Sequence, residues 1–193
     1  MRIIAGKYRG RNLKSPASLD TRPTSDRLRE TLFNILAPRI SEAKFLDLCA
    51  GSGAVGIEAL SRGASHATFV DHSRQMRALI ESNLSLCRVG TDEFTVATAD
   101  ALDYLRKASK QNLEPWDLIF FDPPYADDYE GVLVALAEWG SGLLDNDGLL
   151  VVEHFHKTNL PDESGTLHRT RILKQGDSAL SFYAKGESVL AGV

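Results

Sequence analysis

The sequence predicts one α/β domain built on a mostly parallel, doubly wound sheet of seven strands. From Lys44 onward, short apolar runs alternate with stretches of helical periodicity, and parallel strands need such helical crossovers between them. The 193 residues, 43% of them hydrophobic, are also enough to form one sizeable core. The expected strands are Phe45–Leu48, Ala67–Val70, Phe94–Ala97, Leu118–Phe121, Leu149–Glu153, Arg169–Lys174 and Ala179–Tyr183.

The chain begins with a short predicted β-hairpin, residues 2–13, that carries several cations. After a proline-containing loop we expect a helix that Thr24 or Ser25 caps and Pro38 ends. The apolar residues of this helix fall on one stripe: Leu28, Leu32, Ile35 and Leu36. The same spacing predicts that Arg29 lies on or near the outer face.

Helices are expected between the first five strands, which is why we predict that those strands run parallel. These helices are Val55–Arg62, Arg74–Ser85, Ala101–Lys107 and Gly131–Trp139. Only a short turn, Gly176-Asp177, separates the last two strands, so we expect them to pair antiparallel at an edge of the sheet.

Charge is distributed unevenly along the chain. Residues 1–44 hold ten Lys/Arg and four Asp/Glu, a net charge of +6, so the other residues carry −10 of the overall −4. A basic end on an acidic body predicts a docking site for a polyanion, although a solvated surface explains the charge equally well. We divide the chain into a basic extension, residues 1–20, and a single domain, residues 21–193.

The composition argues against several classes of protein. No apolar stretch has the length of a membrane span, and the first residues lack the apolar core of a signal peptide. The two cysteines, Cys49 and Cys87, lie far apart, so we expect neither a disulfide framework nor a zinc site, and a cytoplasmic location. His154 and His156 lack a third ligand nearby, so no metal is predicted. Nothing in the sequence requires a dimer.

A strand, a glycine-rich turn and the start of a helix follow one another over residues 45–56. Gly51–Gly56 matches the pattern GxGxxG, which on its own is weak because nicotinamide dehydrogenases share it. Asp47, four residues before Gly51, can face the ammonium group of an amino-acid moiety. A ligand with a methionine head and an adenosine tail, S-adenosylmethionine, fits this arrangement.

Two more acids stand at strand ends, where ligands of such sheets bind. Asp71 can accept hydrogen bonds from both ribose hydroxyls, and Asp100 can accept one from the adenine amine. The predicted cofactor-binding residues are Asp47, Ala50, Gly51, Ser52, Gly53, Asp71, His72, Asp100, Ala101 and Asp122.

The tetrapeptide Asp122-Pro123-Pro124-Tyr125 follows an apolar strand directly. Proline fixes its own φ and keeps the preceding residue extended, so this segment should be rigid. The Asp122 carboxylate and the Pro123 carbonyl can accept N–H bonds from one exocyclic amine, and Tyr125 offers a stacking face. We predict that Asp122, Pro123, Pro124 and Tyr125 form the catalytic segment of an enzyme that methylates an amino group on a nucleobase.

The glycine loop, strand-end acids and DPPY segment resemble, in this order, the class I S-adenosylmethionine-dependent methyltransferases. The blocks 2–11, 22–30, 50–64 and 176–183 are similar to the RsmD family. The resemblance implies the seven-stranded Rossmann-like sheet of that class, with an antiparallel edge, and methylation of the N2 amine of one guanine in 16S ribosomal RNA of the small subunit. It favours RNA contacts by Lys7, Arg9, Arg11, Arg22, Thr24 and Arg29. Cys49 stands where an aromatic residue is common in this family.

Three other functions remain open. A DNA amino-methyltransferase acting on adenine N6 or cytosine N4 uses a similar tetrapeptide, but the chain has no obvious target-recognition domain. A nicotinamide-dependent oxidoreductase is favoured only by GxGxxG and leaves the DPPY segment unexplained. A catalytically silent RNA-binding module would have no need of Asp47, Asp71 and Asp122.

Overall fold

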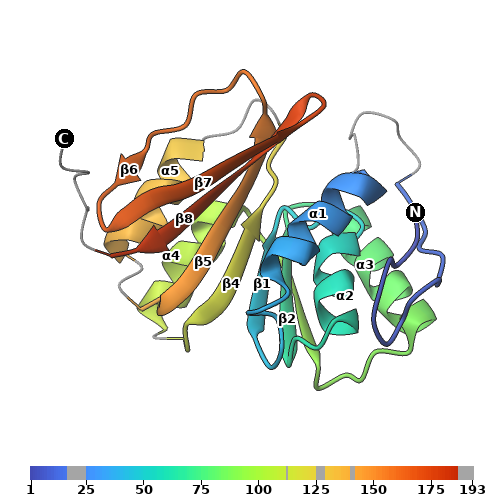
Figure 1. Cartoon of the computed structure of the whole chain (residues 1–193). Helices are drawn as coiled ribbons and strands as arrows, with labels where there is room; N and C mark the ends of the chain where they lie inside the picture. Colours follow the sequence, from blue (N-terminus) through green and yellow to red (C-terminus); the bar gives the residue numbers. More distant parts are fainter. Residues whose placement is uncertain (17–24, 112, 125–128, 140–141, 187–193) are drawn as a thin grey trace.

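The computed structural model describes residues 1–16, 25–111, 113–124, 129–139 and 142–186. Its centre is one eight-stranded sheet with the order β3-β2-β1-β4-β5-β8-β7-β6 (Figure 1). The strands are β1 (Lys44–Leu48), β2 (His66–Asp71), β3 (Phe94–Thr98), β4 (Trp116–Phe121), β5 (Leu144–Phe155), β6 (Glu163–Ser164), β7 (Leu167–Gln175) and β8 (Ser178–Lys185). The helices are α1 (Asp26–Leu36), α2 (Ala54–Ser61), α3 (Arg74–Cys87), α4 (Ala101–Lys110), α5 (Tyr129–Val134) and a π-helical turn, η1 (Ala135–Trp139).

The pairing of the strands confirms the predicted fold class. Strands β1 to β5 pair parallel with one another, while β8 pairs antiparallel with both β5 and β7. The structure adds an eighth strand, β6, that was not predicted. This strand has two residues, which is too short for a periodic pattern to reveal it, and it forms by pairing with the beginning of β7.

Helices cover both faces of the sheet, and each face has its own hydrophobic core. The helices α1, α2 and α3 lie on one face and α4, α5 and η1 on the other (Figure 1). The residues of the central strands β1, β2 and β4 are almost all buried, which explains the largely apolar sequences of these strands. The predicted helix Gly131–Trp139 is divided into α5 and η1, a change of hydrogen-bond pattern that apolar periodicity does not report.

The first sixteen residues form an antiparallel loop that packs against the first core. Ile3 N–H donates to the Arg11 carbonyl at 3.0 Å, Gly10 N–H donates to the Ile3 carbonyl at 2.9 Å, and one bridge joins Arg2 to Asn12. The predicted hairpin therefore exists as a loop with a single bridge. Three of its apolar side chains belong to the core beneath α1, α2 and α3: Ile3, Tyr8 and Leu13.

A buried carboxylate on α2 holds this N-terminal loop in place. Glu58 is fully buried and accepts hydrogen bonds from Ile4 N–H at 2.8 Å, Ala5 N–H at 3.0 Å and Arg62 Nε at 2.8 Å. Arg29 Nε lies 3.9 Å from the second Glu58 oxygen. A buried charge needs such compensation, because an unpaired one is strongly destabilising.

The expectation that Arg29 lies on the outer face was wrong. Its side chain is fully buried, and Nη2 donates to the Arg2 carbonyl at 2.6 Å and to Asp26 Oδ1 at 2.9 Å. The guanidinium is drawn inward by the Glu58 carboxylate and by the main chain of the N-terminal loop. Helical periodicity could not show this, because the partners come from two distant segments. The cap was predicted correctly, since Ser25 accepts a hydrogen bond from Leu28 N–H.

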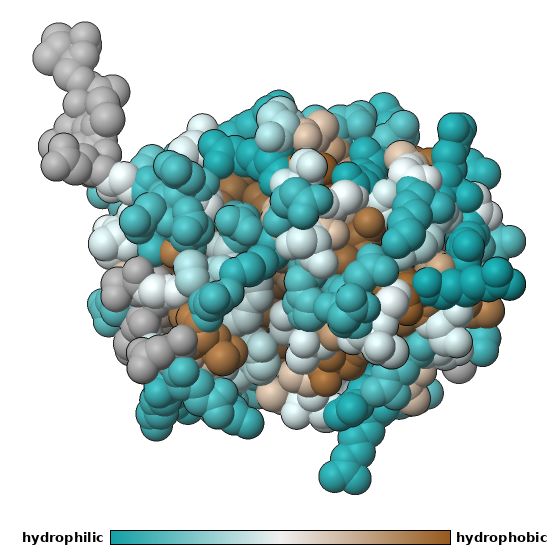
Figure 2. Space-filling view, turned by 90° about the horizontal axis from the view of Figure 1, so that it is seen from below, coloured by the Kyte–Doolittle hydropathy of each residue, from teal (hydrophilic) through white to brown (hydrophobic). Residues whose placement is uncertain are grey.

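The face of the molecule in Figure 2 is covered mainly by hydrophilic side chains, and its apolar areas are small and separated from one another. Among the residues that the structure describes, no helix is both long and apolar enough to cross a bilayer.

We expect Glu58→Ala to lower the free energy of unfolding by about 3–5 kcal/mol, because it removes the buried carboxylate beside Arg29 and leaves two backbone N–H groups without an acceptor. Urea denaturation measures this change. Glu81→Ala is the matched control: it removes the exposed partner of Arg77 on α3 and should cost no more than about 0.5 kcal/mol. Equal losses in the two variants would contradict the anchoring role of Glu58.

Candidate active site

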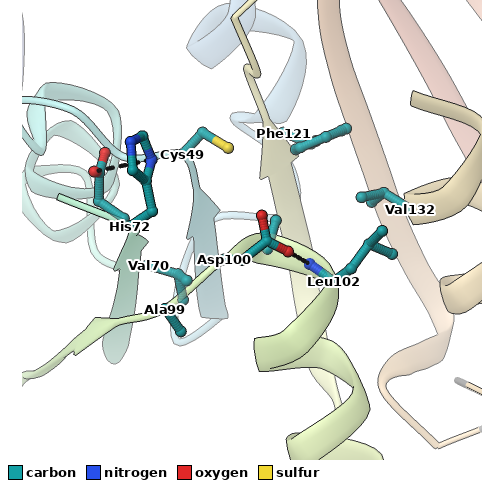
Figure 3. A pocket seen from close by; sticks show the side chains of 10 residues that line it. Cys49, Val70, His72, Ala99, Asp100, Leu102, Phe121 and Val132 are labelled. Atoms are coloured by element: carbon teal, nitrogen blue, oxygen red, sulfur yellow. Dashed lines mark hydrogen bonds and ion pairs between the residues drawn. The ribbon is translucent and has the colours of Figure 1, made fainter. Parts of the chain in front are cut away.

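A pocket opens where the carboxyl ends of β1, β2, β3 and β4 come together. It is lined by Cys49, Val70, Asp71, His72, Ala99, Asp100, Ala101, Leu102, Phe121 and Val132. Figure 3 shows Cys49, Asp100, Phe121 and Val132 around a common space. Ligands of open α/β sheets bind at this edge, so the position of the pocket agrees with the sequence prediction. Four predicted cofactor residues line it: Asp71, His72, Asp100 and Ala101.

The glycine loop lies beside the pocket and depends on backbone geometry that other residues adopt with difficulty. Gly51 and Gly53 have φ values of 54° and 77°, in the left-handed region. A Cβ atom on Gly56 would lie 2.3 Å from the Phe69 ring, so only glycine lets α2 pack this closely against β2. Ala50 N–H donates to the Val70 carbonyl at 3.0 Å, which fixes the loop to the neighbouring strand end.

Asp71 connects the glycine loop to the turn after β2. One carboxylate oxygen accepts from Gly51 N–H at 2.9 Å, and the other accepts from Ser73 N–H at 2.9 Å. The exposed His72 ring lies 3.8 Å from Asp71, the contact drawn in Figure 3. Each carboxylate oxygen can accept a second hydrogen bond, so Asp71 can hold the loop and still accept from a ligand hydroxyl.

Asp100 caps the start of α4 and also lines the pocket. One of its oxygens accepts from Leu102 N–H at 2.9 Å and from Asp103 N–H at 3.3 Å, which caps the helix (Figure 3). The side chain is nevertheless solvent-exposed and lines the pocket, so it can also accept a hydrogen bond from a ligand amine.

Asp47 lies behind the glycine loop and is not among the residues that line the pocket. Its carboxylate is 2% exposed and accepts from Gly56 N–H at 2.8 Å. The pKa of Asp47 is raised to about 8, mainly by burial; the Gly56 N–H opposes this shift and the nearby Asp71 adds to it. The structure thus gives Asp47 a contact with the start of α2, which sequence spacing alone did not indicate.

The DPPY segment continues directly from β4 beside the end of β1. Asp122 N–H donates to the Leu48 carbonyl at 3.4 Å, and the Asp122 side chain is half-buried. Pro123 is buried and Pro124 is exposed. Tyr125 lies outside the described residues, so its predicted role in stacking stays a prediction.

Sequence reasoning missed six of the lining residues: Cys49, Val70, Ala99, Leu102, Phe121 and Val132. Cys49 stands where an aromatic residue is common in the family and was not predicted as a site residue, yet it lines the pocket and has a φ of 62°. Its position between a strand and a glycine loop was the available signal. Val132 comes from α5, which only the three-dimensional fold brings to this edge of the sheet.

Three predicted RNA contacts lie together on the N-terminal loop. Lys7 and Arg9 are exposed and Arg11 is half-buried. Lys7 pairs with Glu93 at 3.4 Å, Arg11 donates to the Leu86 carbonyl at 2.9 Å, and both cations lie against the Tyr8 ring. Arg29 is buried and cannot contact a ligand from this position, while Arg22 and Thr24 lie outside the described residues. No group of three His, Cys, Asp or Glu side chains suited to a metal occurs in the described part of the chain.

The raised pKa of Asp47 predicts a stability that depends on pH. The folded state keeps the proton up to about pH 8, whereas an unfolded Asp loses it near pH 4. Stability is therefore highest below pH 4 as far as this group is concerned, and falls by up to about 1.4 kcal/mol per pH unit between pH 4 and 8. Asp47→Asn should flatten this part of the profile. Urea denaturation at pH 5, 6, 7 and 8 measures it, and parallel profiles for the two proteins would contradict the assignment.

Comparisons with known proteins agree with this geometry. The family described as "Conserved hypothetical protein 95" matches residues 1–184. A Bacillus subtilis protein named "Putative rRNA methyltransferase YlbH" is 38% identical over 185 residues, which cover 96% of this chain and 99% of that protein. The Escherichia coli K12 "Ribosomal RNA small subunit methyltransferase D" is 38% identical over 193 residues, covering 97% of this chain and 93% of the relative.

A solved structure shows that the fold is shared as well. The "Putative methyltransferase yhhF" from Escherichia coli superimposes with a TM-score of 0.82 at 36% sequence identity, covering 96% of this chain and 97% of that one. The predicted resemblance is thereby confirmed over nearly the whole chain. This protein belongs to the RsmD family of methyltransferases.

Proposed function

We propose that this protein transfers the methyl group of S-adenosylmethionine to the exocyclic N2 amine of a guanine in 16S ribosomal RNA of the small subunit. The observation that carries the proposal is the position of Asp122-Pro123 beside a polar pocket that suits adenosine. Support for the substrate comes from the two relatives whose names specify ribosomal RNA.

The pocket has the chemistry to bind the adenosine of this cofactor. Asp71 would accept from the ribose hydroxyls and Asp100 from the adenine amine, because each carboxylate retains lone pairs beyond those used by backbone N–H groups. Val70, Phe121 and Val132 supply apolar walls for a flat base. Gly51 has open space where a Cβ atom would stand, so a ligand can approach the backbone of the loop.

The buried Asp47 would contribute to the methionine end of the site through the loop rather than by direct contact. Its hydrogen bond to Gly56 N–H fixes the beginning of α2, and the residues Ala50, Ser52 and Gly53 form the turn between them. The positive N-terminal end of α2 favours the ligand's carboxylate.

The chemistry of the target amine depends on the segment after β4. The bound cofactor supplies an electrophilic methyl group for in-line displacement by the amine. Asp122 and the Pro123 carbonyl would accept the two N2–H groups, which aligns the nitrogen lone pair with the methyl group. Once the nitrogen has been alkylated it becomes acidic, and the ionised Asp122 would take its proton and pass it to solvent. Tyr125 would stack on the extruded base.

The cations of the N-terminal loop would hold the RNA by its phosphates. Such contacts position a nucleic acid without reading its sequence. Recognition of one guanine then requires the shape of the RNA, so we expect the substrate to be folded rRNA within the small subunit or an assembly intermediate. The reaction would then take place in the cytoplasm. We propose that one copy of the chain is enough, with no metal.

We expect methyl transfer from labelled S-adenosylmethionine to small subunits that lack the modification, with N2-methylguanosine as the product in nucleoside mass spectrometry. Asp122→Ala should lower kcat by at least about 100-fold, because it removes both orientation and the proton acceptor. The control Asp103→Ala, which removes the exposed partner of Arg106 on α4, should retain full activity.

Naked rRNA and duplex DNA are assayed in parallel. Formation of N6-methyladenine or N4-methylcytosine in DNA would identify a DNA amino-methyltransferase instead. Cofactor binding without label in any substrate would favour the silent RNA-binding module.

Arg9→Ala should weaken rRNA binding and lower the slope of log K against log salt by about 0.7, the value for one phosphate contact to a single strand. Arg9 is an exposed cation at the turn of the N-terminal loop. Lys110→Ala, on α4 across the sheet, removes the same charge and should leave the slope unchanged. Filter binding between 50 and 200 mM salt measures both, and an equal effect of the two substitutions would contradict the proposed contact.

A further inference from the structure

A buried amide on α3 joins the N-terminal loop to the glycine loop. Asn83 is fully buried. Its Oδ1 accepts from Lys14 N–H at 2.9 Å, and its Nδ2 donates to the Lys14 carbonyl at 3.1 Å and to the Ser52 carbonyl at 2.9 Å. The side chain thus uses its acceptor and both donors, and its partners are main-chain groups of two segments 38 positions apart in the sequence.

Only asparagine satisfies all three bonds from this position. Its amide pairs with both polar groups of Lys14 as a neighbouring strand would, while the second amide hydrogen reaches Ser52. An aspartate would keep the acceptor and lose both donors, and an apolar side chain would remove the partner of the buried Ser52 carbonyl and of two partly buried groups of Lys14. The arrangement is therefore specific to the side chain and is more than packing.

The two segments that Asn83 joins have different parts in the proposed reaction. Lys14 ends the loop that carries Lys7, Arg9 and Arg11, whereas Ser52 lies between the two left-handed glycines of the cofactor loop. A second contact follows the same route, because Ser52 Oγ lies 3.8 Å from the sulfur of Met1. These contacts join the N-terminal loop to the turn that would border the cofactor.

We propose that Asn83 is a positioning residue that couples rRNA binding on the N-terminal loop to cofactor binding at the glycine loop, so that each ligand raises the affinity for the other. The inference rests on the proposed function. RNA bound to the exposed side chains of the N-terminal loop would restrict the remaining fluctuations of the loop and, through the Asn83 amide, those of Ser52. The cofactor would then lose less conformational entropy on binding. The effect is reciprocal, because the coupling of two binding equilibria is the same in both directions.

The test measures the dissociation constant of S-adenosylhomocysteine by calorimetry, with and without saturating small subunits whose 16S rRNA lacks the modification. For the natural protein we expect rRNA to lower this constant at least about fivefold. In Asn83→Ala and Asn83→Asp the two constants should become equal. Asn83→Asp keeps the bond from Lys14 N–H and loses the donor to Ser52. If Asn83→Ala does not fold, the ratio of the two dissociation constants is therefore measured in Asn83→Asp.

Ser82→Ala is the matched control. Ser82 precedes Asn83 and accepts a hydrogen bond from the Lys14 ammonium at 2.9 Å, but no bond connects its side chain to the glycine loop in the described structure. This variant should retain the full effect of rRNA on cofactor affinity. A residue that served stability alone would change the melting temperature and leave the ratio of the two constants unaltered.

Three results would overturn the coupling: a ratio of one in the natural protein, an unchanged ratio in a folded Asn83 variant, or loss of the ratio in Ser82→Ala. Methyl transfer by the natural protein to the same rRNA separates this failure from a failure of the proposed function. Methylated product together with a ratio of one rejects only the coupling. Absence of both product and rRNA binding rejects both proposals.

Discussion

The structure depends on one buried carboxylate, that of Glu58. An ionised group in an apolar core is tolerated only when hydrogen bonds and opposite charges surround it, and the partners here come from the N-terminal loop, from α1 and from α2 itself. The helix α2 begins at the glycine loop, so the same carboxylate fixes the N-terminal cations relative to the cofactor pocket. One buried charge thus holds together the two parts that the proposed reaction would use.

The pocket is built by backbone groups as much as by side chains. Asp71 accepts from the glycine loop and from the turn after β2, and Asp100 caps α4, so both acids are held at the sheet edge before any ligand arrives. A site that is ordered in advance loses little conformational entropy on binding. The close contact of Gly56 with Phe69 serves the same end, since it seats α2 against the sheet.

Local patterns in the sequence were enough to predict the parallel order of β1 to β5, the antiparallel end of the sheet and the gathering of Asp71 and Asp100 at one edge, because each follows from periodicity and from strand ends. What failed depended on contacts between distant segments. Arg29 is drawn inward by Glu58, Val132 reaches the pocket from α5, and β6 exists only because β7 offers it a partner. No window of neighbouring residues contains this information.

The N-terminal loop has a consequence for how such an enzyme can diversify. Ile3, Tyr8 and Leu13 complete the core over α1, α2 and α3, and Glu58 and Asn83 each bond to the main chain of the loop. A binding arm on a flexible tether could be exchanged between genes as an independent module. This loop is part of the folded body. If it binds RNA as proposed, a new RNA target would arise by changes in its exposed side chains, while the buried residues that anchor the loop stay the same.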